Sequence, residues 1–560
     1  MLKKILFIAV TCYFGSSLPA VAQVDPTETI QPTRPNPPSP QELPHSTPPI
    51  KIELSPSLPT ESFEGLEEKI TVKKIEILGS TIFSQQELEA VVKPFINRTL
   101  TFEQLLGVRI AVTKLYISRG YATSGAFLPI QDFTSGNLQV QVVEGEVERV
   151  EIQGLRRLKQ GYVRSRLEAA TKAPVSIPKL ESALQILQLN PLFESLNVQL
   201  SDGSAPGRSI LTLNLKEAPP FFSTLVLDNK EPPSVGSFGG TAILIHKNLL
   251  GFGDRLDVAR GITQGVNNYS MSYQIPVNAR NGTLGLRYSK GRNEVIEEPF
   301  DPLEITGRTQ TYAIDFRQPV ILTPTEELAF GVSAQLRQSK TFLFDEEPFS
   351  FTQGSENGES KVSVLRFSTD WLNRRSPSTV LAASSIFSLG LGILDATVND
   401  TGTDGRFLSW QGQFQWVQAL NTRRDTVLIS RVVAQLTPDS LLPLEQFAIG
   451  GADSVRGYRT NQAVASNGLF GSVEVRFPIV RAEESGFGLL QFTPFIDVGS
   501  VWGDNSSSQT LLSTGLGLRW QLGDSILARL DWGIPLVSVD DQGDSLQDDG
   551  ISFSLQTNFF

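Results

Sequence analysis

The sequence predicts a protein with two α+β modules followed by a 16-stranded antiparallel transmembrane β-barrel. A strand–helix–helix–strand–strand pattern occurs twice between about residues 70 and 220. From Phe221 to Phe560, about sixteen segments alternate apolar and polar residues, and no apolar run there reaches the ~18 residues that a membrane helix needs. These 340 residues give about 21 residues per strand with its connection, which is typical of outer-membrane barrels.

The composition excludes several functional classes. The 560 residues include 48 Lys plus Arg and 59 Asp plus Glu, so the formal charge of −11 argues against nucleic-acid binding. Only two histidines and one cysteine, Cys12, occur, which is too few for a closed His/Cys zinc site within one copy. We therefore expect no metal, no cofactor and no nucleic-acid partner.

The first 22 residues have the features of a signal peptide. Lys3 and Lys4 precede an apolar stretch of about ten residues, and Ala20 and Ala22 form a small-x-small cleavage pattern, so the mature chain is expected to begin at Gln23. The alternative, a membrane anchor, needs a longer apolar stretch. Residues 23–66 then form a proline-rich linker, with ten prolines in the 28 residues from Pro32 to Pro59. We predict an extended spacer, although recognition of its Pro-x-x-Pro pieces remains an alternative.

Residues 67–146 are expected to form the first module. Ser84 opens a helix with Glu87 at capping-box spacing, and a second, densely apolar helix ends at Gly120. Three strands are predicted around these helices: 70–78, 126–130 and 138–143.

Residues 147–219 repeat the same order of elements. The expected strands and helices are strand 147–152, helices 162–171 and 177–189, and strands 193–200 and 210–215. One ordinary α+β domain of about 150 residues is the alternative interpretation. Two modules are favoured because Glu144-Gly145 and Glu217-Ala218 end the copies at equivalent points.

The barrel is expected to occupy residues 220–560. Alternation alone does not distinguish a membrane barrel, whose apolar face points outward, from a soluble sandwich, whose apolar face points inward. The number of segments favours the barrel. Aromatic residues at segment ends fit the girdles of a membrane barrel: Tyr273, Tyr288, Tyr312 and Trp532. The last strand, 551–560, is expected to close the barrel against the first, 221–228.

A long connection between the eleventh and twelfth strands carries the most specific signal. It runs over residues 437–467 and contains Val455-Arg456-Gly457-Tyr458, and loops of this length are more often functional than idle. In the strand Phe495 to Gly499, alternation places Asp497 on the polar lumen side, where a carboxylate needs a partner.

These motifs, with the two modules and the sequence from Asn248 to Asp254, resemble the two-partner secretion transporters, the filamentous-haemagglutinin and haemolysin secretion/activation proteins of the POTRA-plus-barrel superfamily. The resemblance implies that the modules are POTRA domains 1 and 2, and that the loop folds into the barrel. It also implies an ion pair between Arg456 and Asp497, with Val455, Gly457 and Tyr458 at the loop tip and Phe495 and Gly499 in the barrel motif. The alternative is that Arg456 and Asp497 each face water in a wide pore.

The resemblance further implies a monomeric outer-membrane pore whose periplasmic POTRA domains recognise an unfolded exported protein, a large β-helical exoprotein, and pass it to the cell surface. Residues 23–31 are too short and polar for the plug helix that many family members carry. An insertase for barrel proteins is the main alternative, although such proteins usually have three or more POTRA domains. A passive porin is a minor one. An enzyme is disfavoured, because no G-x-S-x-G, H-E-x-x-H or P-loop motif occurs.

Overall fold

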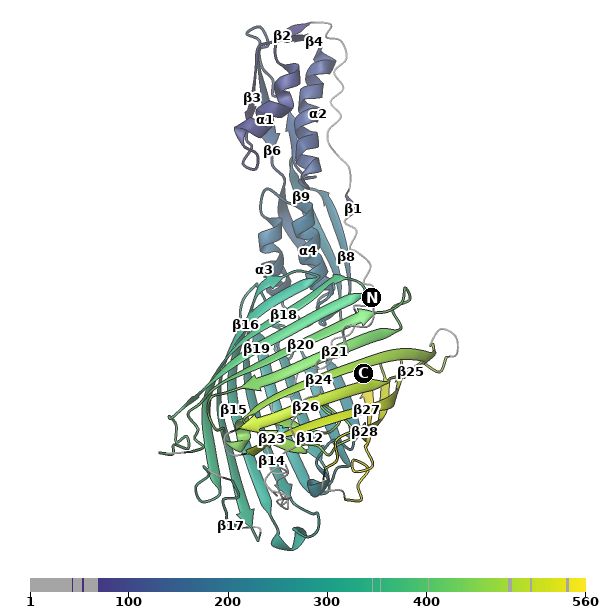
Figure 1. Ribbon diagram of the computed structural model, residues 1–560. Coiled ribbons are helices and arrows are strands. Elements are labelled where there is room, and N and C mark those ends of the chain that lie inside the picture. The colour runs from purple at the N-terminus through teal and green to yellow at the C-terminus, as the bar shows by residue number, and fades with distance from the viewer. Residues whose placement is uncertain are drawn as a thin grey trace, which may run out of the picture.

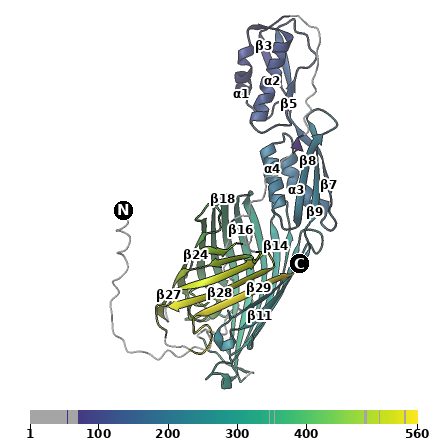
Figure 2. The same cartoon turned by 90° about the vertical axis from the view of Figure 1, so that its right-hand side faces the viewer.

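The computed structural model describes residue 43, residues 53–54 and residues 69–560, except 345, 353, 401, 482–485, 504–505, 540–542 and 560. The expected signal peptide and plug-helix region, and nearly all of the linker, lie outside the described residues. Two small α+β modules stand in line on one end of a β-barrel, as Figures 1 and 2 show from two sides. No helix in the described ranges is long and apolar enough to cross a membrane.

The first module packs two helices on a three-stranded sheet of order β3-β6-β5, in which β3 and β6 are parallel. Its elements are β2 (Ile70–Val72), β3 (Lys74–Leu78), α1 (Gln85–Val92), η1 (Lys93–Phe95), β4 (Arg98–Leu100), α2 (Phe102–Ser118), β5 (Gly125–Phe127) and β6 (Asn137–Val143). Ser84 and Glu87 form the expected capping box at the start of α1.

Two strand predictions in this module are wrong in detail. The predicted strand 70–78 divides at Lys73, whose N–H donates to the Gly136 carbonyl at 2.7 Å, so β2 pairs with β4 while β3 joins the main sheet. The predicted strand 126–130 ends at Phe127. Pro129 has no amide N–H to donate, and the Gln131 side chain bonds the backbone of Gln139 in β6 at 2.7 and 2.8 Å in place of a strand.

The second module repeats the arrangement with a sheet of order β8-β9-β7, and residues 53–54 (β1) add a short parallel strand to the edge of β8. Its elements are β7 (Glu146–Gln153), α3 (Gln160–Thr171), α4 (Ile177–Gln188), β8 (Phe193–Asp202) and β9 (Arg208–Glu217). A separate apolar core fills each module, one around Val108 and Leu138, the other around Leu180 and Leu213.

A glutamate at the end of each module binds the loop that follows the module's first strand. Glu144 accepts hydrogen bonds from the Thr81 and Ile82 amides at 2.7 and 3.2 Å, and from the Tyr116 hydroxyl at 3.0 Å. Burial, followed by the contact with Glu144, raises the pKa of Tyr116 to about 12. Glu217 accepts from the amides of residues 156–158 at 2.9 to 3.3 Å. The equivalent points seen in the sequence therefore have the same structural role.

The remaining chain forms a closed barrel of 16 antiparallel strands, as predicted. The pairing of β10 with β29, from Ser223 with Phe559 to Asp228 with Ser554, closes it. The strands are β10 (Phe221–Asp228), β11 (Gly239–Lys247), β12 (Arg255–Ile262), β13 (Val266–Pro276), β14 (Thr283–Glu294), β15 (Thr306–Leu322), β16 (Glu326–Leu343), β18 (Glu359–Ser376), β19 (Thr379–Leu391), β20 (Leu408–Ala419), β21 (Val427–Leu436), β24 (Asn467–Val480), β25 (Leu489–Phe492) with β26 (Phe495–Gly503), β27 (Ser506–Leu522), β28 (Ile526–Pro535) and β29 (Ile551–Phe559). β25 and β26 count as one strand because both pair with β24 and β27, and β17 (Glu347–Pro348) only extends β16.

The second module is joined to the barrel by the turn between β11 and β12. Asp254 accepts hydrogen bonds from the Leu250 and Phe252 amides and so shapes this turn. The turn then docks on α3, because the Lys159 N–H donates to the Gly251 carbonyl at 2.9 Å and the Lys159 ammonium lies 3.5 Å from the centre of the Phe252 ring.

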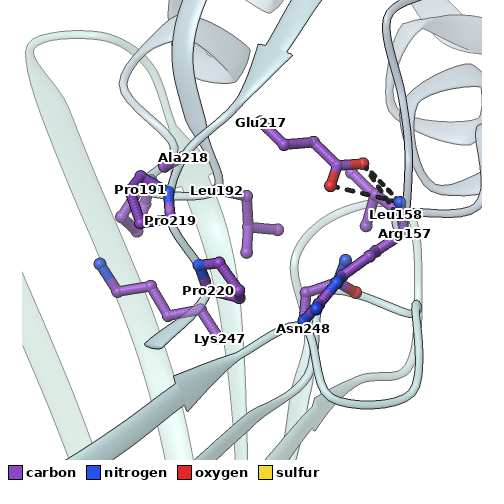
Figure 3. A pocket seen from close by; sticks show the side chains of 10 residues that line it. All are labelled: Arg157, Leu158, Pro191, Leu192, Glu217, Ala218, Pro219, Pro220, Lys247 and Asn248. Carbon is purple, nitrogen blue, oxygen red and sulfur yellow. Dashed lines mark hydrogen bonds between the residues drawn. The ribbon is translucent and has the colours of Figure 1, made fainter. Parts of the chain in front are cut away.

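Figure 3 shows the other side of this joint. There Glu217 reaches Arg157 and Leu158 above Lys247 and Asn248 of the barrel. The cavity between these groups measures only about 10 Å³, so module and barrel are closely packed.

Candidate functional site

The connection between β21 and β24 folds back into the barrel. It leaves the end of the barrel opposite the modules and forms η4 (Pro443–Glu445) and a hairpin of β22 (Phe447–Ile449) and β23 (Ala463–Ala465). The hairpin and the loop tip pack on the inner wall in one buried apolar cluster: Val433, Phe447, Ile449, Val455, Tyr458, Ala463, Ala465, Phe470, Val501 and Leu511. This packing places the motif of residues 455–458 against β24, β26 and β27.

The structure brings Arg456 and Asp497 together. The Arg456 Nε and Nη2 atoms donate to the two carboxylate oxygens of Asp497 at 2.7 and 2.9 Å, and the Arg456 backbone amide donates to the same group at 3.2 Å. The side chains are 5% and 0% exposed, so neither faces open water. A bidentate contact of this kind fixes both the depth and the orientation of the loop tip.

Arg456 also belongs to a larger charged cluster that sequence reasoning missed. Its Nη1 donates to Glu474 at 2.6 Å and lies 3.8 Å from Asp531. Arg529 bonds both of these carboxylates, at 2.9 and 2.5 Å, and Arg476 bonds Glu474 at 2.9 Å. Three guanidinium groups thus face three carboxylates, and the buried charges balance. Glu474, Arg476 and Arg529 alternate onto the lumen side of their strands, but alternation alone does not indicate their partners.

The other predicted site residues make room for the loop tip or support it. A side chain at Gly499 would meet Val455 at 2.8 Å, and Gly457, with φ of +92°, lies against the backbone of Gly533 in β28. The Phe495 ring lies under Arg456, with 3.4 Å from the guanidinium carbon to the ring centre.

Tyr458 ties the tip to β27 and to the connection that follows β28. Its hydroxyl lies 2.8 Å from the Leu512 carbonyl oxygen and 2.9 Å from that of Val537. All seven site residues predicted from the sequence therefore meet at one place.

Two further anchors hold the same loop. Near its start, Glu445 bonds Arg337 of β16 at 2.7 Å and Arg366 of β18 at 2.8 Å, with Arg337 and Glu445 both 4% exposed. Beyond the tip, Arg459 bonds Asp548 at 2.5 Å and Glu297 at 2.9 Å, which connects the loop to two other barrel connections. No sequence spacing links these partners, which lie 79 to 162 residues apart.

The arrangement acts as an electrostatic clamp, and its arginines and carboxylates neutralise one another. Within the described ranges, no group of three or more His, Cys, Asp or Glu side chains is placed to hold a metal ion. Releasing the loop requires these pairs to separate and become hydrated.

A family model described as haemolysin secretion/activation protein ShlB/FhaC/HecB matches residues 207–520, and the POTRA domain model of ShlB type matches residues 70–145. The chain belongs to this family. Its members are transporters, and the chain is an outer-membrane transporter of two-partner secretion, with its POTRA domains in the periplasm. These findings confirm the fold, family, function and location that the sequence predicted.

Known relatives agree with this assignment. The outer membrane transporter CdiB of Escherichia coli O6:K15:H31 is 26% identical over 496 residues, which cover 84% of this chain and 79% of that protein. The heme/hemopexin transporter protein HuxB of Haemophilus influenzae strain 86-028NP is 20% identical over 484 residues, or 82% of each chain.

Solved structures show the same fold. CdiB from Escherichia coli aligns with a TM-score of 0.69 at 22% identity, covering 92% of this chain and 94% of that one. BamA from Haemophilus ducreyi lacking POTRA domains 1-3 is a more distant neighbour, with a TM-score of 0.52 at 14% identity, covering 87% of this chain and all of that one.

Proposed function

We propose that this transporter passes an unfolded secreted protein through the barrel lumen, and that the loop of residues 437–467 is the gate. The observation that carries the proposal is the clamp: Arg456 is held by Asp497 and Glu474 inside the lumen, with side chains at most 8% exposed. An ion-pair clamp suits a gate, because every charged group can be hydrated once the lumen fills with water or with an extended chain.

The second POTRA domain offers an edge for capture of an extended chain. β8 is the outermost of this domain's three long strands, and residues 53–54 of this chain already pair with its edge at Gln199 and Leu200. Strand addition at a sheet edge binds the backbone of a peptide and so tolerates varied sequences. The exported protein would take the place of this two-residue segment.

We also propose the driving force, the oligomeric state and the kind of partner. No nucleotide is available in the periplasm, so folding of the exported protein outside the cell would supply the driving force. A monomer is sufficient because the lumen and the gate lie within one barrel. The partner is proposed to be a large β-helical exoprotein, and no catalytic step is assigned to the chain.

Deletion of the gene, followed by proteomics of culture supernatant and outer membrane, tests the function. Loss of one or a few large secreted proteins with other barrels unchanged is the expected result. Broad depletion of barrel proteins would instead favour the insertase alternative.

Complementation with Arg456→Ala should give an assembled barrel that exports poorly. Arg287→Ala is the matched control and should export normally, because the bidentate pair of Arg287, at 2.7 Å for both bonds, is with Asp315 on the lumen wall and not with the loop.

Photo-crosslinking tests the capture step. A photoreactive residue at the exposed position Gln199 on β8 should crosslink to the exported protein while it is in transit. The same residue at Glu168, exposed on α3, should give little product. Equal crosslinking at both positions would contradict capture at the β8 edge.

A further inference from the structure

The outer wall of the barrel has a one-sided cluster of cations. The ion pairs Arg287–Asp315 and Arg337–Glu445 lie in the lumen and so identify the inward face of their strands. Because side chains alternate along a strand, the residues between these inward positions point outward. By this register six outward cations lie toward the extracellular ends of β12, β14, β15, β16 and β18: Arg260, Lys290, Arg292, Arg308, Lys340 and Lys361. Among the described strand residues, no outward Lys or Arg occurs on β10, β11 or β19 through β29.

These cations are stacked across the strands. Arg292, Arg308 and Lys340 stand directly opposite one another on β14, β15 and β16, in one continuous row. Lys290 and Lys361 lie in the next row toward the membrane, separated by Gln310 and Gln338. Like charges placed directly opposite on neighbouring strands destabilise a sheet, so this arrangement is costly unless an anion offsets it.

The carboxylates near these rows are too few to neutralise them. Glu359 lies 3.5 Å from Lys340 and 3.2 Å from Lys361, and Glu294 continues the outward face of β14 beyond Arg292. Leaving Arg292 aside, five outward cations stand against these two carboxylates among the described strand residues, which is an excess of three positive charges along the wall. Such a patch attracts anionic groups.

An apolar groove begins immediately below the cations on the same strands. Its volume is about 610 Å³, within the range of about 300–1,000 Å³ usual for ligand sites, and its lining is almost wholly apolar. The outward side chains that line it include Met271, Leu286, Tyr288, Tyr312, Leu336 and Leu365.

Between the groove and the cations, a polar group marks the membrane interface. Gln310 donates toward the Tyr288 hydroxyl at 3.1 Å and the Tyr312 hydroxyl at 2.6 Å, and the two rings lie 5.1 Å apart. Aromatic residues with polar tips are typical of this level of a membrane barrel. From the membrane outward, the wall therefore presents an apolar groove, then hydroxyl groups, then cations.

We infer that this sector binds an anionic lipid of the outer leaflet, with its phosphate groups on Arg308, Lys340 and Lys290 and its acyl chains in the groove. The order of apolar, polar and cationic groups matches the order of groups in such a lipid. A soluble anion would use the cations but not the groove, and a neutral lipid would use the groove but not the cations.

Native mass spectrometry of the detergent-solubilised full chain tests the inference with three probes: diphosphoryl lipid A, its dephosphorylated form with the same acyl chains, and inorganic phosphate. We expect diphosphoryl lipid A to bind, the dephosphorylated form to bind at least about 10-fold more weakly, and equimolar inorganic phosphate not to displace the lipid. Equal binding of the two lipid forms, or displacement by phosphate, would overturn the inference.

Variants on the outer wall locate the site. Lys290→Gln/Arg308→Gln/Lys340→Gln should lower lipid binding about 10-fold or more, and Arg308→Gln alone should lower it measurably if the triple variant assembles poorly. Ala334→Trp, which fills the groove from an exposed position, should also lower it. The control Lys73→Gln/Lys74→Gln/Lys114→Gln removes the same charge from exposed positions of the first POTRA domain and should bind as the wild type does. Equal loss in the control, or none in the wall variants, would contradict the assigned site.

Discussion

Removing Arg456 should raise the ratio of open to closed gates far more than removing an arginine from a similar ion pair elsewhere on the lumen wall. Arg456→Ala deletes two hydrogen bonds to Asp497 and one to Glu474, all between 2.6 and 2.9 Å. It leaves three carboxylates facing two guanidinium groups. Asp497, which is 0% exposed, then keeps its Ser472 hydroxyl bond at 2.6 Å and the backbone amide bond of residue 456 at 3.2 Å, but it loses its bidentate cation. Breaking one side of a buried pair costs about 3–5 kcal/mol.

The lower end of that range applies here, because water from the lumen can enter the space that the side chain leaves. A change of about 3 kcal/mol raises the ratio of open to closed gates by about 100-fold. Asp497→Asn keeps the size of the side chain, and Arg456 keeps Glu474, so a loss of about 1–2 kcal/mol and a change of about 10-fold are expected. The exposed pair of Arg287 and Asp315 contributes about 0–1 kcal/mol, and its loss should change the ratio less than about 5-fold.

Single-channel recording in planar bilayers measures this ratio directly. The expected order of open probability is Arg456→Ala, then Asp497→Asn, then Arg287→Ala close to the wild type. Thermal unfolding of each barrel provides the control for assembly. If Arg456→Ala opened no more often than Arg287→Ala, the ion pair would not hold the gate, and the reasoning above would be refuted.

Two other predictions concern separate parts of the molecule. Gly499→Val should displace the loop tip and raise channel opening, because a Cβ there meets Val455 at 2.8 Å; Gly471→Ala, where the nearest atom is 3.6 Å away, should not. The raised pKa of Tyr116 stabilises the first POTRA domain below pH about 10, and this contribution should be lost as the pH rises through about 12. Thermal unfolding of the full chain between pH 9 and 12 should show this loss, Tyr116→Phe should weaken it, and an unchanged pH dependence would contradict the assignment.

The regular parts of the fold were predictable because they repeat. Alternation with a period of two indicated the barrel strands, and two copies of one pattern indicated the two modules. The errors lie where a single backbone contact overrides the pattern. Lys73 has good strand neighbours on both sides, yet its hydrogen bond to Gly136 divides the strand, and Ile130 is fully exposed because Pro129 and the Gln131 side chain end β5.

The site was predictable only as far as a motif marks it. Arg456 and Asp497 follow from the resemblance of two short motifs, and the structure places them in contact. Glu474, Glu445 and Arg459 carry no such motif. Each could be assigned to the lumen or to a loop, but its partner depends on how deeply the loop folds into the barrel, and this depth is a property of the packed hairpin rather than of any local sequence.

The chemistry of the proposed gate accounts for both a defined closed position of the loop and reversible opening. The apolar cluster around Ile449 and Val455 sets where the hairpin sits, but apolar contacts alone would make opening costly, since the exposed area meets water. Buried ion pairs behave differently, because the energy lost on separating them is largely returned when the charges are hydrated. Removing one partner prevents this exchange and leaves an unpaired charge in the closed state. A gate that opens reversibly therefore needs intact pairs, and a chain lacking Arg456 should have a pore that opens easily but closes poorly.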